Sequence, residues 1–272
     1  MNLHIKYYTA LLFLFVMSFS ASSQDQMRAT KPKPVKKKKQ VYEVVNNVVK
    51  LNIPGLLIRS FGVQYERKLN RSKSFAMGVI YRPNFKTPIL NVLLQDTNFT
   101  ASAETLFMLK SSRYRSLMLT PEFRFYFKKK APRGLYVAPF LRYKHEMLSS
   151  NFRYQESSNG GIIKTGVYKN RSDAFGAGIL FGLQVLTRKK VSIDFWFLGP
   201  WVGIQFTKNS SDIPTASLNE FDKAYIESVT EGYNDRFGYD NTYKWTGTGF
   251  GNSRSGFTLG LRMFGIHIGY SF

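Results

Sequence analysis

Residues 173–186, DAFGAGILFGLQVL, decide the fold of this chain, because two kinds of side chain alternate along them. One face is apolar and mostly bulky, and carries Phe175, Ala177, Ile179, Phe181, Leu183 and Val185. The other face is small and polar except at Leu180, and carries Gly176, Gly178, Gly182 and Gln184. Successive strand side chains point to opposite faces, so the apolar face suits lipid and the small polar face suits a narrow barrel interior. The stretch therefore predicts a membrane-spanning β-strand.

Seven further segments alternate with the same period of two, and no long helical pattern accompanies them. They cover 44–53, 61–69, 75–82, 117–127, 135–147, 191–206 and 256–272. The eight segments together predict an all-β fold, an eight-stranded antiparallel up-and-down transmembrane β-barrel. A soluble lipocalin-like barrel is the alternative, but it would place apolar residues inside and polar residues outside.

Two positions disturb this regular pattern. The alternation of the last segment changes phase, which predicts a β-bulge near Arg262 and Met263. Pro139 lies within a predicted strand, where its missing N–H is unfavourable, and periodicity does not explain it.

The links between the segments alternate in length, as they do in outer-membrane barrels. The short links are 70–74, 128–134 and 187–190, and the long links are 84–115, 149–172 and 207–255. We therefore expect short periplasmic turns, long extracellular loops and a periplasmic location for both termini.

The longest link, 207–255, combines seven acidic residues with many aromatic ones. Ser217 and Glu220 fit a capping box, which predicts one short helix over 218–230. The aromatic residues either pack the loop over the barrel mouth, which we favour, or form a surface for a partner or a glycan.

The first 23 residues have the layout of a secretory signal peptide, with Lys6, an apolar run over 10–19 and small residues before Gln24. An apolar run of this length is too short to cross a bilayer as a helix. We expect 24–43 to be a basic, disordered periplasmic tail and 44–272 to be the barrel. The absence of cysteine excludes disulfides, thiol nucleophiles and a lipoprotein anchor.

The formal net charge of +22 would ordinarily indicate a nucleic-acid partner, but most of the charge lies in the tail and the short links. We call this set the periplasmic basic patch: Lys36, Lys37, Lys38, Lys39, Arg71, Lys73, Lys128, Lys129, Lys130, Arg133, Arg188, Lys189 and Lys190. Each basic residue near an anionic surface contributes about 1 kcal/mol, so the patch predicts contact with outer-membrane lipids or an acidic protein. Solvated turns and a solvated tail are the alternative, and no nucleic-acid partner is expected.

A set of charged residues has the parity of the barrel interior: Lys50, Glu66, Lys68, Arg82, Glu122, Arg124, Arg142, Lys144, Glu146 and Asp194. Buried charges must be paired, and an eight-stranded barrel has room for side chains and little else. We therefore favour a structural plug of cross-strand ion pairs over a polar pocket or narrow pore.

The residues predict no catalytic site, metal site or cofactor. His145 precedes Glu146 near the upper rim, but adjacent strand residues face opposite ways, so the two do not share a site. His267 has interior parity, and the sequence shows no convergent set of metal ligands.

Several stretches together resemble a family of small outer-membrane barrels, OmpA/OmpX/OmpW-like in size, known mainly from the Bacteroidota and catalogued as a domain of unknown function. The matching stretches are VKLNIPG (49–55), FGVQYERKL (61–69), PEFRFYF (121–127), APRGLYVAPFLRY (131–143), GAGILFGLQ (176–184), DFWFLGP (194–200) and 265–272. The resemblance implies an eight-stranded barrel in the outer membrane of a Gram-negative envelope, and it brings no activity, ligand or active-site residue.

We expect a non-enzymatic protein with a structural or protein-interaction role, as an accessory subunit of a larger envelope complex. A binding or transport module for small molecules at the barrel mouth is the alternative, and an outer-membrane lipid-modifying enzyme is a more distant one. The chain ends in an apolar alternation with Tyr270 and Phe272, which resembles the signal that outer-membrane assembly machinery reads during biogenesis.

Overall fold

The computed structural model describes residues 45–86, 102–157, 161–187, 190–215, 217–237 and 243–272. These residues belong to one compact unit, Glu43–Phe272. The predicted signal peptide and the whole of the predicted tail lie outside the described residues.

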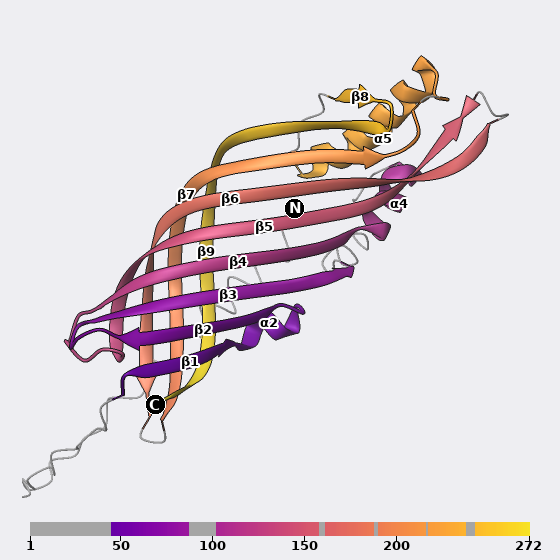
Figure 1. Cartoon of the computed structure of the whole chain (residues 1–272). Coiled ribbons are helices and arrows are strands. Elements are labelled where there is room, and N and C mark those ends of the chain that lie inside the picture. The colour runs from indigo at the N-terminus through magenta and orange to yellow at the C-terminus, as the bar shows by residue number, and fades with distance from the viewer. Residues whose placement is uncertain (1–44, 87–101, 158–160, 188–189, 216, 238–242) are drawn as a thin grey trace, which may run out of the picture. The chain divides into compact units, whose positions relative to one another are not determined.

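Eight strands form a closed antiparallel ring, in which the first strand pairs with the last (Figure 1). They are β1 (Asn47–Asn52), β2 (Phe61–Lys68), β3 (Lys73–Lys86), β4 (Arg113–Tyr126), β5 (Gly134–Glu156), β6 (Ile162–Leu186), β7 (Val191–Asp212) and β9 (Gly249–Ser271). A short ninth strand, β8 (Lys244–Thr246), forms a hairpin with the start of β9. The predicted eight-stranded up-and-down barrel is thereby confirmed.

The outer face of every strand in the ring carries exposed apolar side chains. One from each strand illustrates the belt: Leu51, Tyr65, Val79, Phe125, Leu141, Phe181, Val202 and Leu261. Inward neighbours such as Lys50, Gln64 and Gln184 are buried and polar. The barrel therefore has the inverted distribution that the alternation predicted, with apolar residues outside and polar residues inside.

The prediction that 149–172 forms a long loop is wrong. Strands β5 and β6 continue through most of it as one hairpin, far beyond the apolar belt. In this upper part the outward residues become polar, as at Asn151 and Arg153, while Phe152 and Tyr154 face inward and are buried. Here the outer face carries polar groups, and the apolar inner face is covered by helices. The strand pattern is therefore the reverse of that in the belt, which is why the sequence did not show these strands.

In the described residues there are three helices: α2 (Ile53–Leu57), α4 (Ala103–Ser111) and α5 (Glu220–Phe237). The helix predicted at 218–230 exists as α5, but it begins later and is longer. The Asn219 side chain, rather than the expected Ser217 of a capping box, accepts the backbone N–H of Asp222 at 2.8 Å. Helices α2 and α4 were not predicted, since each is short and lies within a link.

The phase change expected near Arg262 and Met263 occurs, but without a bulge against the neighbouring strand. Met263 and Phe264 are both exposed, yet the register between β7 and β9 is the same on either side of them. Strand β7 has a matching phase change at Phe197 and Leu198, and the register shift lies between β6 and β7. The two strands therefore change phase together, and the Phe197 and Phe264 rings lie 6.4 Å apart.

Pro139 pairs with Ile179 of β6 and faces outward. On the β4 side of β5 the ladder around Pro139 is interrupted. Of the β4–β5 pairs there, only Leu119↔Tyr143, Glu122↔Phe140 and Phe125↔Val137 form, and the positions between them are unpaired. Since proline donates no backbone hydrogen bond, it is tolerated where the ladder is already broken.

Candidate functional site

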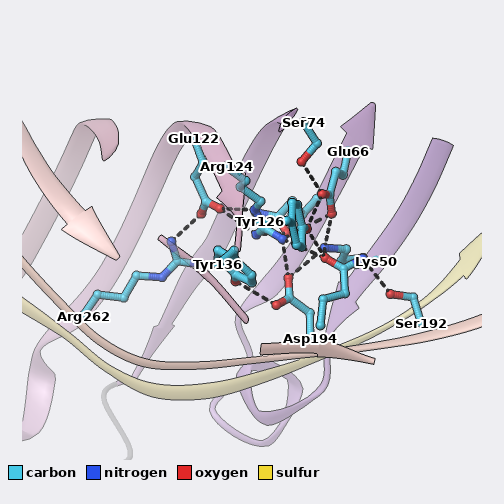
Figure 2. A network of polar contacts seen from close by, with 12 residues as sticks. Lys50, Glu66, Ser74, Glu122, Arg124, Tyr126, Tyr136, Ser192, Asp194 and Arg262 are labelled. Atoms are coloured by element: carbon cyan, nitrogen blue, oxygen red, sulfur yellow. Dashed lines mark hydrogen bonds and ion pairs between the residues drawn. The ribbon is translucent and has the colours of Figure 1, made fainter. Parts of the chain in front are cut away.

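The interior of the barrel holds a buried ionic network to which all eight strands of the ring contribute (Figure 2). Lys50 of β1 donates from Nζ to Glu66 Oε2 of β2 at 2.5 Å and to Asp194 Oδ2 of β7 at 2.7 Å. It also donates to Gln184 Oε1 of β6 at 2.9 Å. All four side chains are fully buried, so the Lys50 ammonium is held by partners that lie far apart in the sequence.

Arg124 of β4 forms the centre of the network. Its guanidinium donates to three carboxylates, with Nη1 2.7 Å from Asp194 Oδ2 and 3.2 Å from Glu66 Oε2, and Nη2 2.6 Å from Glu122 Oε2. The same group lies over the ring of Tyr136, 4.5 Å from its centroid. A planar guanidinium with five donors suits this arrangement, in which one cation holds three acids together.

Neutral side chains satisfy the remaining acceptors. Tyr126 Oη donates to Glu66 Oε1 at 2.6 Å, and Tyr136 Oη donates to Asp194 Oδ1 at 2.8 Å. Ser74 Oγ donates to the same Glu66 oxygen as Tyr126 at 2.5 Å. Buried carboxylates are costly unless their lone pairs are used, and these contacts use them.

Arg262 of β9 completes the network, since its Nη1 lies 2.5 Å from Glu122 Oε1. The three acids Glu66, Glu122 and Asp194 are thereby balanced by the three bases Lys50, Arg124 and Arg262. A charge-balanced network across five strands of a narrow barrel can fix these strands relative to one another. These six charges cancel, so the network itself carries no net charge.

Of the ten predicted interior charges, the structure brings together Lys50, Glu66, Glu122, Arg124 and Asp194. Arg142 is buried too, but it lies against the rings of Phe140 and Trp201 instead of a carboxylate of the network. The other four are partly exposed: Lys68, Arg82, Lys144 and Glu146. Lys144 and Glu146 form their own ion pair at 2.7 Å.

Sequence reasoning did not place Arg262, Tyr126, Tyr136 or Gln184 in the network. Arg262 could have been found, because the phase change expected beside it, with Leu259 and Leu261 facing out, turns this residue inward. Tyrosine and glutamine are too common on polar strand faces to give a signal by themselves.

The two histidines expected after processing lie on different faces of the wall. His267 is buried, with its ring 4.3 Å from that of Trp196. His145 is partly exposed, and its Nδ1 lies 2.8 Å from Asp173 Oδ1 of the neighbouring strand. In the described part of the chain, no group of three or more histidines and carboxylates could hold a metal ion. No helix there is long and apolar enough to cross a membrane.

The short links gather the described members of the periplasmic basic patch at one end of the barrel, which we call the turn end (Figure 1). These are Arg71, Lys73, Lys128, Lys129, Lys130, Arg133 and Lys190. Lys36, Lys37, Lys38, Lys39, Arg188 and Lys189 lie outside the described residues. The C-terminus lies at the same end. There Tyr270 and Phe272 face outward, and the Phe272 backbone is hydrogen-bonded to that of Asn47.

Fold and interior together define a closed antiparallel barrel with an apolar exterior and a charge-filled lumen. Among solved structures, the chain is similar to CarO2 of Acinetobacter baumannii, with 11% sequence identity, coverage of 84% of this chain and 98% of that chain, and a TM-score of 0.34. No family model and no curated protein matches the chain.

Proposed function

We propose that this chain is an outer-membrane β-barrel with a structural or protein-interaction role, in which the ionic network closes the lumen. The observation that carries the proposal is the belt of exposed apolar side chains on all eight strands around a charged interior. Water-soluble proteins rarely expose contiguous apolar surface of this extent, whereas lipid-facing barrel walls require it. The proposed role is non-enzymatic.

Electrophoretic migration in detergent tests the membrane barrel. We expect the purified protein to migrate as a compact species without heating and as a slower, unfolded species after heating. The protein should also need detergent to remain monomeric. A soluble monomer in detergent-free buffer would contradict the proposal.

The edge of β9 supports a protein-interaction role. On its β1 side, β9 pairs with β8 at Gly249–Gly251 and with β1 at His267–Ser271. Between these pairings, none of the described strands is hydrogen-bonded to β9 on this side. The same stretch carries exposed Leu259 and Leu261. Backbone groups in hydrocarbon require hydrogen-bond partners, so this edge fits an added strand from another protein.

Single-cysteine crosslinking tests that interaction, because the chain has no native cysteine. We expect Leu259→Cys to give a crosslinked adduct in native membranes. Phe175→Cys is the matched control and should give none, because Phe175 is also apolar and exposed but pairs on both sides, with Tyr143 of β5 and Ile204 of β7. Equal adducts from both variants, or none from either, would oppose an interaction at this edge. Affinity purification of tagged protein would then identify the adduct.

A hollow at the other end of the barrel, which we call the cap end, favours small-molecule binding as a second candidate function. It has a volume of about 610 Å³ and is lined by polar residues of β7, β8 and the start of β9, among them Asn209, Asp212 and Lys244. Ligand-dependent protection of Lys244 from amine modification, without ionic current through the barrel, would favour this function over a purely structural one.

A further inference from the structure

A row of basic residues crosses the outer wall of the barrel just above the apolar belt, towards the cap end. Arg115 of β4 opposes Met147 of β5, Met147 opposes Arg171 of β6, and Arg171 opposes Lys208 of β7. The three basic side chains are exposed on the outer face. We call Arg115, Arg171 and Lys208 the basic collar.

The collar directly borders the belt. Two residues further down, Asp173 lies opposite Phe206, and below them Phe175 lies opposite Ile204. Phe175, Ile204 and Phe206 are all strongly exposed apolar side chains. In a membrane-spanning barrel, this border is the depth at which lipid headgroups meet the protein.

The charges of the collar are not neutralised by the described residues around them. Asp173, the nearest carboxylate in the row below, accepts instead from Tyr143 Oη and His145 Nδ1 of β5, each at 2.8 Å. In the row above, Lys169 is paired with Asp212 at 2.5 Å. None of the described carboxylates forms an ion pair with Arg171 or Lys208. Like charges directly opposite each other destabilise a strand pair, so an anion bound between Arg171 and Lys208 would reduce their electrostatic repulsion.

The space for such an anion exists. A hollow of about 460 Å³ is lined by the cations Arg171, Lys208 and Arg254, by one carboxylate, Asp173, and by Phe206, Thr207, Ser253 and Ser255. It offers three cations and hydroxyl donors above an apolar surface, and its one carboxylate, Asp173, is already bonded to Tyr143 and His145. This combination matches a phosphate headgroup with acyl chains beneath it.

We propose that the basic collar binds the phosphate of a phosphorylated lipid in the outer leaflet. Arg171 and Lys208 contact the phosphate, and the acyl chains lie along Phe206 and Ile204. The proposal rests on the proposed outer-membrane location and adds the class of lipid that the wall recognises.

The test compares lipids retained by the purified full chain in detergent micelles, measured by native mass spectrometry. The probes are a bisphosphorylated acylated glucosamine disaccharide and the same lipid without its phosphates. We expect the wild type to prefer the phosphorylated lipid. Arg171→Gln combined with Lys208→Gln should weaken its binding about thirtyfold, because each of the two lost cations removes about 1 kcal/mol of attraction to the phosphate. Arg171→Lys should retain most of the binding.

Lys169→Gln and Arg67→Gln are the matched controls. Lys169 is one row higher but already paired, and Arg67 is exposed near the turn end. Each should bind as the wild type does. The collar proposal fails if the wild type holds both lipids equally, if the controls lose as much binding, or if equimolar inorganic phosphate displaces the lipid. Heat-modifiable migration is followed in every variant, so failure of the barrel itself is seen separately.

Discussion

At Arg124 one guanidinium contacts the carboxylates of Glu66, Glu122 and Asp194 in a space closed to solvent. These partners come from β2, β4 and β7, so a single side chain connects strands on different walls of the barrel. An unpaired carboxylate in this environment loses far more solvation free energy than an exposed one. The stability of the whole interior therefore depends on individual residues.

Arg124→Gln should lower the free energy of unfolding by about 3–5 kcal/mol, because it leaves three acids facing two bases in a buried site. Urea unfolding in lipid vesicles, followed by tryptophan fluorescence, measures the change. Arg67→Gln removes an exposed cation and should change stability by no more than about 0.5 kcal/mol. Similar effects of the two substitutions would mean that the network does not stabilise the barrel.

A second residue-scale feature is the close approach of aromatic rings to glycines in the wall. At Gly182, a Cβ would lie 2.4 Å from the Tyr136 ring and 2.8 Å from the Phe195 carbonyl oxygen. Tyr136 cannot withdraw freely, because its hydroxyl donates to Asp194 in the network. Gly182 therefore leaves room for the ring on which the network depends.

Gly182→Ala should destabilise the barrel by about 1–3 kcal/mol through overpacking. The midpoint temperature of heat-modifiable migration is a convenient measure. Gly256→Ala on β9 is the matched control, since no atom lies within 4 Å of the added Cβ. If Gly182→Ala melts at or above the temperature of this control, the close packing seen at Tyr136 is not restrictive.

Helices α4 and α5 pack with the upper part of the β5–β6 hairpin around a hydrophobic core. It contains Met108, Leu109, Leu148, Phe152, Tyr154, Tyr168, Ile213, Leu218, Ile226, Val229 and Phe250. Burial raises the pKa of the neighbouring Tyr243 hydroxyl above its ordinary value. Of the aromatic residues in the longest link, Tyr243, Trp245 and Phe250 thus pack in or against this core, whereas Phe221 and Tyr225 are exposed.

Ile226→Asn should loosen this core without opening the barrel, because Ile226 is fully buried in it. We expect faster proteolysis within 213–248, while migration before and after heating stays that of a folded barrel. Phe221→Asn, at a position 77% exposed on the same helix, should leave the proteolysis rate unchanged. Loss of the compact species in Ile226→Asn would instead mean that the cap and the barrel fold as one unit.

The whole molecule is asymmetric, with basic short links at the turn end and a helical cap at the opposite end. Cationic links are held at an anionic inner leaflet by the field of its headgroups. We therefore expect the cap to face the cell exterior.

Cysteine labelling of intact cells measures this orientation, again because native cysteine is absent. Lys244→Cys, exposed in the cap, should react with a membrane-impermeant maleimide. Arg71→Cys, exposed at the turn end, should react only after the outer membrane is permeabilised. The reverse pattern would invert the proposed topology.

Period-two alternation was sufficient to predict the eight strands of the ring, the outward apolar side chains and five residues of the network. Alternation is a local property, and the choice between lipid and interior is made residue by residue along each strand. It was insufficient where the surroundings changed, as in the upper β5–β6 hairpin, where the pattern predicts a loop over 149–172 and the structure has paired strands.

Which inward charges meet was decided only by the tertiary structure. Arg124 reaches Asp194, and Arg262 reaches Glu122, because the stagger of the strands brings distant residues to one level of the barrel. The same stagger places Arg171 opposite Lys208 on the outer wall. Strand stagger is a property of the closed ring as a whole, so no single stretch of sequence contains it.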